Sequence, residues 1–336
     1  MNLRSFVAGC AGLSLSPDES AFFREARPWG LILFSRNIES RDQVRALTDS
    51  FRDLLGDGVA VLVDQEGGRV QRLGPPNWRA LPPAAVYGRL NSDGAHLAEL
   101  AGRLIAEDLR AVGIDVDCAP VLDTPAPGAH DIIGDRAYAV APDDVARLGR
   151  AAAQGLMAGG VMPVMKHIPG HGRARADSHL ELPRVPEAYE ALMADFAPFR
   201  ANSDLPAAMT AHVVYDALDP YFPATHSRIV IESVVREEIG FDGLLLSDDL
   251  SMNALQGRYF ERAARAFAAG VDLALHCNGD LQEAGAVAQA APFLAGKSLE
   301  RVERARAQVA AARSAAAPFD PVDAEEELHS ALAALA

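Results

Sequence analysis

The chain has 336 residues, and its hydrophobic content of 49% and charged content of 23% are ordinary for a globular protein. It contains no stretch long and apolar enough to span a bilayer. The formal net charge of −15 argues against nucleic acid or an anionic membrane surface as the main partner, because binding to either requires a field of the opposite sign. We therefore expect a small ligand that is uncharged or mildly charged.

The N-terminal segment from Val7 to Cys10 resembles a bacterial lipoprotein cleavage site. Arg4 lies so close, however, that no adequate apolar region precedes the cysteine. We interpret the segment from Phe6 to Gly12 as the first core strand instead.

The chain has three cysteines, Cys10, Cys118 and Cys277. Their number is odd, they are far apart in the chain, and most of them fall inside strand-like runs. These features are typical of buried, reduced thiols and indicate a cytoplasmic protein.

In chain order, short apolar runs alternate with longer amphipathic segments. The runs are nearly continuous in apolar residues, which is typical of parallel strands covered on both faces. Eight runs are predicted strands: Ser5–Gly9, Leu31–Phe34, Ala60–Asp64, Ile114–Pro120, Val161–Lys166, Ala207–Val213, Gly243–Ser247 and Val271–His276. The segments between them are predicted helices: Arg41–Leu55, Ala95–Val112, Pro142–Ala158, Pro186–Ala201, Ser227–Ile239, Tyr259–Ala268 and Leu281–Phe293. Helix-start residues, Ser40, Ser227 and Asp280, mark the beginning of three of these helices.

Eight strands that alternate with helices can close into a barrel or lie open as a doubly wound sheet. The positions of the polar residues favour the barrel, because they follow the C-terminal ends of several different strands, where barrel enzymes build their sites. An open sheet would concentrate them at one switch point. We therefore predict an α/β fold, a (β/α)8 TIM barrel. The polar residues at the strand ends are Asp64, Asp123, Lys166-His167, His212, Asp248-Asp249 and His276.

The rest of the chain indicates one domain. Ser298–Ala317 is predicted as an Ala/Arg-rich helix and Asp323–Leu335 as an acidic-to-apolar tail, and no linker or internal repeat is evident. We expect a single domain over residues 1–336, with the barrel over about 1–296 and a C-terminal helical extension over about 297–336. No G-x-G-x-x-G follows the first strand and no phosphate-binding P-loop motif occurs, so no nucleotide cofactor is expected.

The densest group of reactive side chains follows the strand that starts at Val161. Lys166, His167, His171, Asp177 and His179 lie within a few turns of chain, beside a break at a Pro-Gly pair. In extended backbone, alternate residues project to one side. Asp177 can therefore bond Nδ1–H of His179 and leave Nε2 free for proton transfer.

Two further strand ends carry carboxylates. The loop DQEGGRVQR is either a solvated salt-bridge loop or a polyol site, in which Asp64 accepts from sugar hydroxyls and Arg72 supplies a fork of donors. The run LLLSDD ends in Asp248 and Asp249. Burying two adjacent carboxylates is costly unless they are paired or used, so this pair is a candidate for chemistry.

Five motifs in this order, VDQEGGRVQR, IGDR, KHIPGHG, ADSH and SDDLSM, resemble those of the family 3 glycoside hydrolases. They are most similar to the single-domain bacterial β-N-acetylglucosaminidases of peptidoglycan recycling. Ile168 stands where that family commonly has Phe, and Arg173-Ala174-Arg175 adds positive charge.

The resemblance implies a TIM barrel and a retaining hydrolase that acts on N-acetylglucosaminyl muropeptides without cofactor or metal. It implies that Asp248 is the nucleophile and that His179 is the acid/base, oriented by Asp177. It also implies a set of contacts to the N-acetylglucosamine ring: Asp64, Arg72, Arg136, Lys166 and His167. A histidine suits the second role, because its pKa near ~6.5 lets it give up and recover a proton at neutral pH.

Three alternatives remain open from the sequence. A metal-dependent barrel hydrolase would use similar residues, but Ser5–Cys10 lacks the His-x-His with which many such enzymes begin. A sugar-binding protein without catalysis would need neither Asp248 nor the Asp177/His179 pair. Phosphorolysis, with phosphate in place of water, is compatible with a neutral base, which repels an anion less than a carboxylate does. The sequence has no heptad pattern that would indicate coiled-coil assembly, and we expect a monomer.

Overall fold

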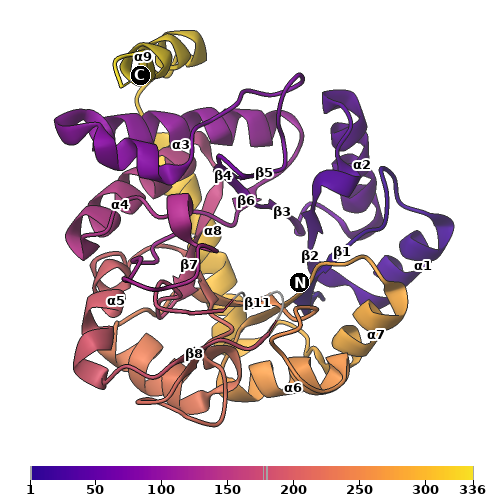
Figure 1. The fold of residues 1–336 in the computed structure, drawn as a ribbon. Helices are drawn as coiled ribbons and strands as arrows, with labels where there is room; N and C mark the ends of the chain where they lie inside the picture. The colour runs from indigo at the N-terminus through magenta and orange to yellow at the C-terminus, as the bar shows by residue number, and fades with distance from the viewer. Residues whose placement is uncertain (1, 177, 179–180, 336) are drawn as a thin grey trace.

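A computed structural model describes residues 2–176, 178 and 181–335 and contains a closed barrel of eight parallel strands with helices around it (Figure 1). Each strand pairs in parallel with the next, and the last pairs with the first. The predicted (β/α)8 barrel is confirmed, and every predicted strand run overlaps one barrel strand. The strands are β1 (Arg4–Gly9), β2 (Pro28–Leu33), β3 (Ala60–Val63), β6 (Val116–Asp117), β7 (Met162–Ile168), β9 (Ala207–Thr210), β11 (Leu244–Asp249) and β12 (Leu273–His276).

The helices form the outer layer. They are α1 (Pro17–Ala26), α2 (Arg41–Leu55), α3 (Gly94–Ala111), α4 (Pro142–Gly159), α5 (Tyr189–Ala201), the π-helix η6 (Val230–Glu238), α6 (Tyr259–Ala269), α7 (Leu281–Ala290), α8 (Gly296–Ala315) and α9 (Pro321–Ala333). The seven predicted interstrand helices all form, and Ser40 and Asp280 cap α2 and α7 as predicted. The prediction did not include α1, although Ser16 and Glu19 form a capping box at its start.

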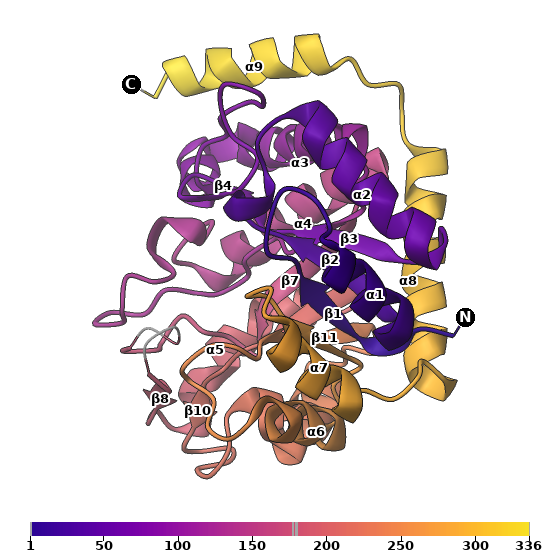
Figure 2. The ribbon, with the colours of Figure 1, turned by 90° about the vertical axis from the view of Figure 1, so that its right-hand side faces the viewer.

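Short strands and 3-10 helices lie in the loops that follow the C-terminal ends of the barrel strands. One antiparallel pair, β4 (Gln65–Gly67) with β5 (Val70–Gln71), follows β3, and one parallel pair joins β8 (Arg184–Val185) to β10 (Val214–Tyr215). The short 3-10 helices are η1 (Ser35–Asn37), η2 (Ala84–Arg89), η3 (Asn91–Asp93), η4 (Gly134–Arg136) and η5 (Ala224–His226). In Figure 2 these loops lie on the left, at one end of the barrel.

The opposite end of the barrel is covered by α8. Figure 1 shows α8 behind the barrel, and Figure 2 shows it upright on the right. The buried Asp272 ties it to the strands, because one carboxylate oxygen accepts from Ser298 Oγ at 2.7 Å and Arg301 at 3.1 Å, while the other accepts from the Leu245 backbone N–H at 3.0 Å. This end is therefore braced by α8, and the other end carries the polar loops.

The core lies between the strands and the helical layer. Every residue of β2, β3, β7, β9 and β12 is buried, as expected of parallel strands covered on both faces. Cys10, Cys118 and Cys277 are buried and free, which confirms the prediction for the thiols. Among the described residues, no helix has both the length and the apolar character needed to cross a membrane.

Candidate active site

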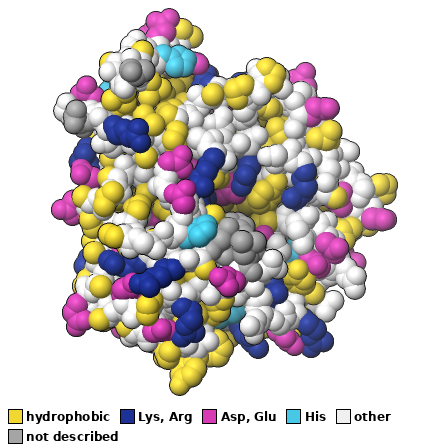
Figure 3. All heavy atoms as spheres, viewed as in Figure 1, with side chains coloured by type: hydrophobic (Ala, Val, Ile, Leu, Met, Phe, Trp, Pro, Cys, Tyr) yellow, Lys and Arg dark blue, Asp and Glu magenta, His cyan; other side chains and the backbone are white. Residues whose placement is uncertain are grey.

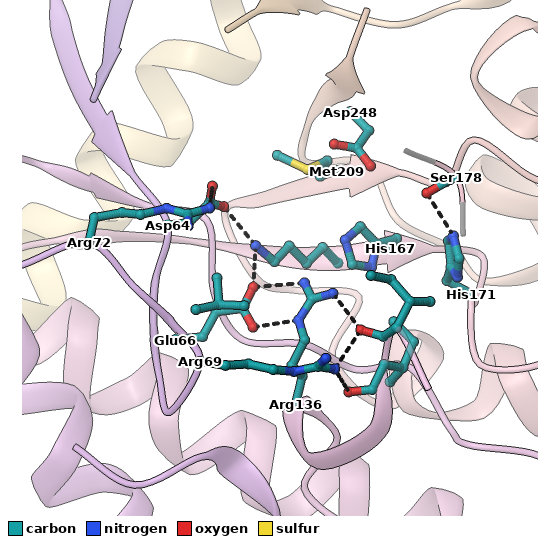
Figure 4. Close-up of a pocket in the computed structure, with 14 residues that line it drawn as sticks. Asp64, Glu66, Arg69, Arg72, Arg136, His167, His171, Ser178, Met209 and Asp248 are labelled. Carbon is teal, nitrogen blue, oxygen red and sulfur yellow. Dashed lines mark hydrogen bonds and ion pairs between the residues drawn. The ribbon is translucent and has the colours of Figure 1, made fainter. Parts of the chain in front are cut away.

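A pocket of about 300 Å³, here called the rim pocket, opens at the C-terminal ends of the strands. Figure 3 shows acidic, basic and His side chains around the centre of this face. Six predicted site residues line the pocket (Figure 4): Asp64, Arg72, Arg136, Lys166, His167 and Asp248. The other two, Asp177 and His179, lie outside the described residues, whereas Ser178 between them in sequence lines the pocket.

Lys166, at the end of β7, is the central cation of the pocket. Its Nζ donates to Asp64 Oδ1 at 2.8 Å and lies 2.7 Å from Glu66 Oε1, and its side chain is only 3% exposed. Burial alone would lower the pKa of Lys166, but the two carboxylates hold it well above its usual value. The ammonium therefore stays charged.

Two arginines complete the network. Arg136 on η4 makes a bidentate pair with Glu66, at 2.8 and 2.9 Å, and Arg72 donates to Asp64 Oδ2 at 3.2 Å. Burial alone would raise the pKa of Asp64 and Glu66, but the surrounding cations hold the pKa of Asp64 well below its usual range and lower that of Glu66. The rim pocket thus presents fixed anionic acceptors and cationic donors, an arrangement suited to a polyhydroxylated ligand.

Asp123 anchors the backbone where β7 ends. Its Oδ2 lies 2.6 Å from His167 Nδ1, and its Oδ1 accepts from the backbone N–H groups of His167 and His171 at 3.2 and 2.6 Å. Burial alone would raise the pKa of Asp123, but His167 and His171 lower it. Since the carboxylate fixes Nδ1 of His167, Nε2 is the nitrogen left without a partner among the described residues.

The segment after β7 is held by its own set of contacts. His171 Nε2 lies 3.3 Å from Ser178 Oγ, and burial together with His167 lowers the pKa of His171 to about 4. Further along, Arg173 donates to Asp195 on α5 at 2.6 Å, and Arg175 pairs with Glu187 at 3.0 Å. These contacts anchor the described part of the segment beside the pocket.

The adjacent carboxylates at the end of β11 have different surroundings. Asp248 lines the pocket and accepts one hydrogen bond among the described residues, from the Asp249 backbone N–H at 2.8 Å. Burial alone would raise its pKa, but His212, His167 and that hydrogen bond lower it. Asp248 is therefore ionised at neutral pH and faces the pocket without a bonded cation.

Asp249, in contrast, is occupied by the local backbone. Its Oδ1 accepts from the N–H groups of Ser251 and Cys277 at 2.9 and 3.1 Å, and its Oδ2 accepts from Ser251 Oγ at 2.6 Å. Its own carbonyl accepts from His212 Nε2 at 3.0 Å. Asp249 thus fixes the strand end that presents Asp248.

The family model described as the Glycosyl hydrolase family 3 N terminal domain matches residues 18–312. The chain belongs to glycosyl hydrolase family 3. This family 3 enzyme is 44% identical, over 286 residues, to a beta-hexosaminidase of Alkalilimnicola ehrlichii, an alignment that covers 83% of this chain and 82% of the relative.

Solved structures agree with this assignment. NagZ from Neisseria gonorrhoeae was solved in complex with N-trifluoroacetyl-D-glucosamine. It matches this chain with a TM-score of 0.78 and 34% sequence identity, and the match covers 93% of this chain and 99% of NagZ. A family 3 beta-N-acetylglucosaminidase from a Paenibacillus strain has a TM-score of 0.82 and 32% identity, covering 97% of this chain and 67% of that chain. The family 3 enzyme is therefore a hydrolase of the glycosidase class.

The sequence reasoning left one central residue of the pocket unassigned. Glu66 carries the contacts to Lys166 and Arg136, and its signal was its position two residues after Asp64. The ion pairs of Asp64 and Glu66 with Lys166 and Arg136 are largely buried, so the solvated salt-bridge interpretation is wrong for these two carboxylates, although Arg69 of the same loop makes an exposed pair with Asp135. His276 follows a strand end as predicted, yet it bonds Glu283 at 3.2 Å and does not line the pocket.

His171 makes the stability of the fold depend on pH. Its folded-state pKa of about 4 lies below the ~6.5 of a free histidine, so the unfolded chain binds a proton first as the pH falls. Stability from this group is present above about pH 6.5 and is lost as the pH falls toward 4. The free energy of unfolding of the wild type should fall between pH 7 and pH 5, and His171 should account for about 2 kcal/mol of that fall. In His171→Gln the fall should be smaller by this amount.

Denaturant unfolding at the two pH values measures this difference. His96→Gln, at an exposed site on α3, is the matched control and should leave the decline unchanged. An equal decline in the wild type and both variants would show that His171 does not titrate as its surroundings imply.

Proposed function

We propose that this family 3 enzyme is a retaining exo-β-N-acetylglucosaminidase that removes terminal β-linked N-acetylglucosamine from peptidoglycan-derived muropeptides. The relatives named beta-hexosaminidase, and the similarity to NagZ in complex with N-trifluoroacetyl-D-glucosamine, support the choice of sugar. The observation that carries the proposal is Asp248, a half-buried and ionised carboxylate that lines a sugar-sized pocket and has no bonded cation among the described residues. Such a group is available for attack on an anomeric carbon.

The remaining lining residues are suited to hold the sugar ring. Asp64 would accept from ring hydroxyls, while Lys166, Arg72, Arg136 and His167 would contact ring oxygens. Because ion pairs already fix most of these side chains, little reorganisation is needed when the sugar binds. The pocket then positions the anomeric carbon against Asp248.

In the proposed first step, an Asp248 oxygen forms a bond to the anomeric carbon while the bond to the leaving oxygen breaks and His179 gives that oxygen a proton. In the second step, His179 takes a proton from water, the water oxygen bonds to the anomeric carbon, and Asp248 is released. Two inversions retain the β configuration. Asp177 would orient His179 and favour its charged form.

The protonation states of the described residues indicate that the proton donor is not one of the pocket's carboxylates. Asp64 and Glu66 have lowered pKa values and are held ionised, so neither carries a proton at neutral pH. The pKa of His171 is about 4, which leaves its ring neutral. His179 follows Ser178, a pocket-lining residue, in the chain. It is therefore our candidate for the acid.

We further propose that residues 1–336 act as a single catalytic domain, with the barrel over about 1–296, and that the enzyme works as a monomer in the cytoplasm. The three buried free thiols are compatible with a reducing compartment. The closed barrel holds the six described candidate residues around one pocket, which supports the single-domain proposal.

Product analysis with an N-acetylglucosaminide tests the function. We expect free N-acetylglucosamine with the β configuration as the first product, with and without phosphate, and much slower cleavage of the matching glucoside. Equal rates on the two sugars would contradict the proposed specificity. Formation of the sugar phosphate whenever phosphate is present would instead identify the enzyme as a phosphorylase.

Asp248→Ala should abolish turnover while leaving the fold intact, because it removes the group that forms the covalent intermediate. Asp249→Ala is the matched comparison one residue away. It should retain more activity but unfold more easily, since its carboxylate accepts three hydrogen bonds from the local chain. If folded Asp249→Ala were inactive and Asp248→Ala active, the nucleophile assignment would be reversed.

His179→Ala should slow the first step strongly for sugar-alcohol leaving groups and much less for an acidic nitrophenol, which needs no proton. With activated substrates the variant should release a burst of phenol and accumulate the Asp248 adduct, because the second step lacks its base. Azide, which needs no base, should restore turnover. Asp177→Ala should behave in the same way, more mildly. An equal loss on every leaving group, without burst or rescue, would assign His179 a positioning role.

A further inference from the structure

A second cavity lies at the N-terminal end of the barrel strands, opposite the rim pocket. This basal cavity has a volume of about 720 Å³, more than twice the 300 Å³ of the rim pocket. Its wall is formed by the first residues of four strands and by one side of α8, the helix on the right in Figure 2. The strand residues include Trp29, Val116 and Met162, which are at most 4% exposed and form the packed inner side of the cavity.

Four arginines converge on the basal cavity from three helices. Arg52 is in the last turn of α2, Arg110 in the last turn of α3, and Arg306 and Arg313 on α8. Two carboxylates, on Asp57 and Asp115, also line the cavity, which leaves a formal charge of +2. On a chain of net charge −15, this is a local reversal of sign.

The four guanidinium groups are not equally occupied. Arg52 donates to Asp115 at 2.7 Å, and Arg306 donates to the Gly58 carbonyl at 2.7 Å. Arg110 and Arg313 are exposed, and neither has a hydrogen-bond acceptor or an ion-pair partner among the residues that the structure describes. Two cations at the cavity are therefore available to a ligand.

Arg110 lies among other guanidinium groups. Partial burial lowers the pKa of Arg110, and the neighbouring guanidinium groups of Arg313 and Arg52 lower it further, while Asp115 opposes them. Arg313 lies across Gly160, where an added Cβ would come within 2.6 Å of Arg313 Cδ. An anion placed between these arginines would relieve their mutual repulsion.

A simpler role for such arginines is to interact with helix C-termini, where cations are stabilising. That role accounts for one arginine in the last turn of each helix. It does not account for the convergence of four arginines on one cavity, because an isolated cation at each terminus would serve equally well.

We propose that the basal cavity binds a small organic phosphate, with the phosphate group between Arg110 and Arg313 and the organic portion in the remaining volume beside α8. Guanidinium forks match phosphate oxygens in a bidentate manner. A phosphate monoester carries about two negative charges at neutral pH, which balances the cavity's formal charge of +2. The volume of about 720 Å³ favours an ester over the bare ion.

Calorimetric titration of the full chain at constant ionic strength tests the proposal with three probes: phenyl phosphate, inorganic phosphate and phenol. Phenyl phosphate should bind, inorganic phosphate should bind at least about tenfold more weakly, and phenol should not bind measurably. Arg110→Ala and Arg313→Ala should each weaken phenyl phosphate about tenfold. Ala310→Glu places a carboxylate at the cavity on an exposed helix position and should abolish binding.

Arg147→Ala, at an exposed arginine on α4 away from the basal cavity, is the matched control and should bind like the wild type. Equal affinities for phenyl and inorganic phosphate would overturn the assignment of an organic ester. Displacement of phenyl phosphate by N-acetylglucosamine, with no effect of Arg110→Ala or Arg313→Ala, would place the phosphate in the rim pocket and overturn the proposal. If the two arginine variants lower the free energy of unfolding but bind phenyl phosphate like the wild type, the arginines only stabilise the helix C-termini and the proposal is wrong.

Discussion

The buried ammonium of Lys166 is the charge around which the rim pocket is assembled. It contacts Asp64 and Glu66, and these carboxylates in turn hold Arg72 and Arg136. Removing charges from water is costly, and the cost is offset only when every member of such a network has its partner. The barrel meets this requirement by bringing β7 between the ends of its neighbours, so that residues distant in sequence meet around one cation.

The sequence predicted the framework well because parallel barrel strands leave a strong signal of continuous apolar residues. It was less precise where local rules conflict. The apolar run Ile114–Pro120 contains only the two-residue strand β6, although Cys118 N–H still donates to the Val63 carbonyl and the Ala119 carbonyl still accepts from Val164 N–H. The predicted helix Ser227–Ile239 forms with π-type geometry, which a short amphipathic pattern does not distinguish from an α-helix.

The candidate site was predictable in part, because side chains at the ends of parallel strands must meet at one rim. This rule predicted correctly that Asp64, Lys166 and Asp248 lie around one pocket. The pairing of Glu66 with Arg136 joins loops 70 residues apart and needs the tertiary structure. The same holds for the difference between Asp248 and Asp249, which depends on which backbone N–H groups reach each carboxylate. The arginines of the basal cavity carry no local motif at all.

The segment after β7 is tied down separately from the barrel network. Arg173 bonds Asp195 and Arg175 pairs with Glu187, whereas the ion pairs of the pocket floor involve none of these residues. Substitutions at Arg173 and Arg175 can therefore accumulate without disturbing the ion pairs of Lys166. Such a division lets natural drift or laboratory evolution reshape the pocket entrance for a new aglycone while the preference for the ring itself is inherited unchanged.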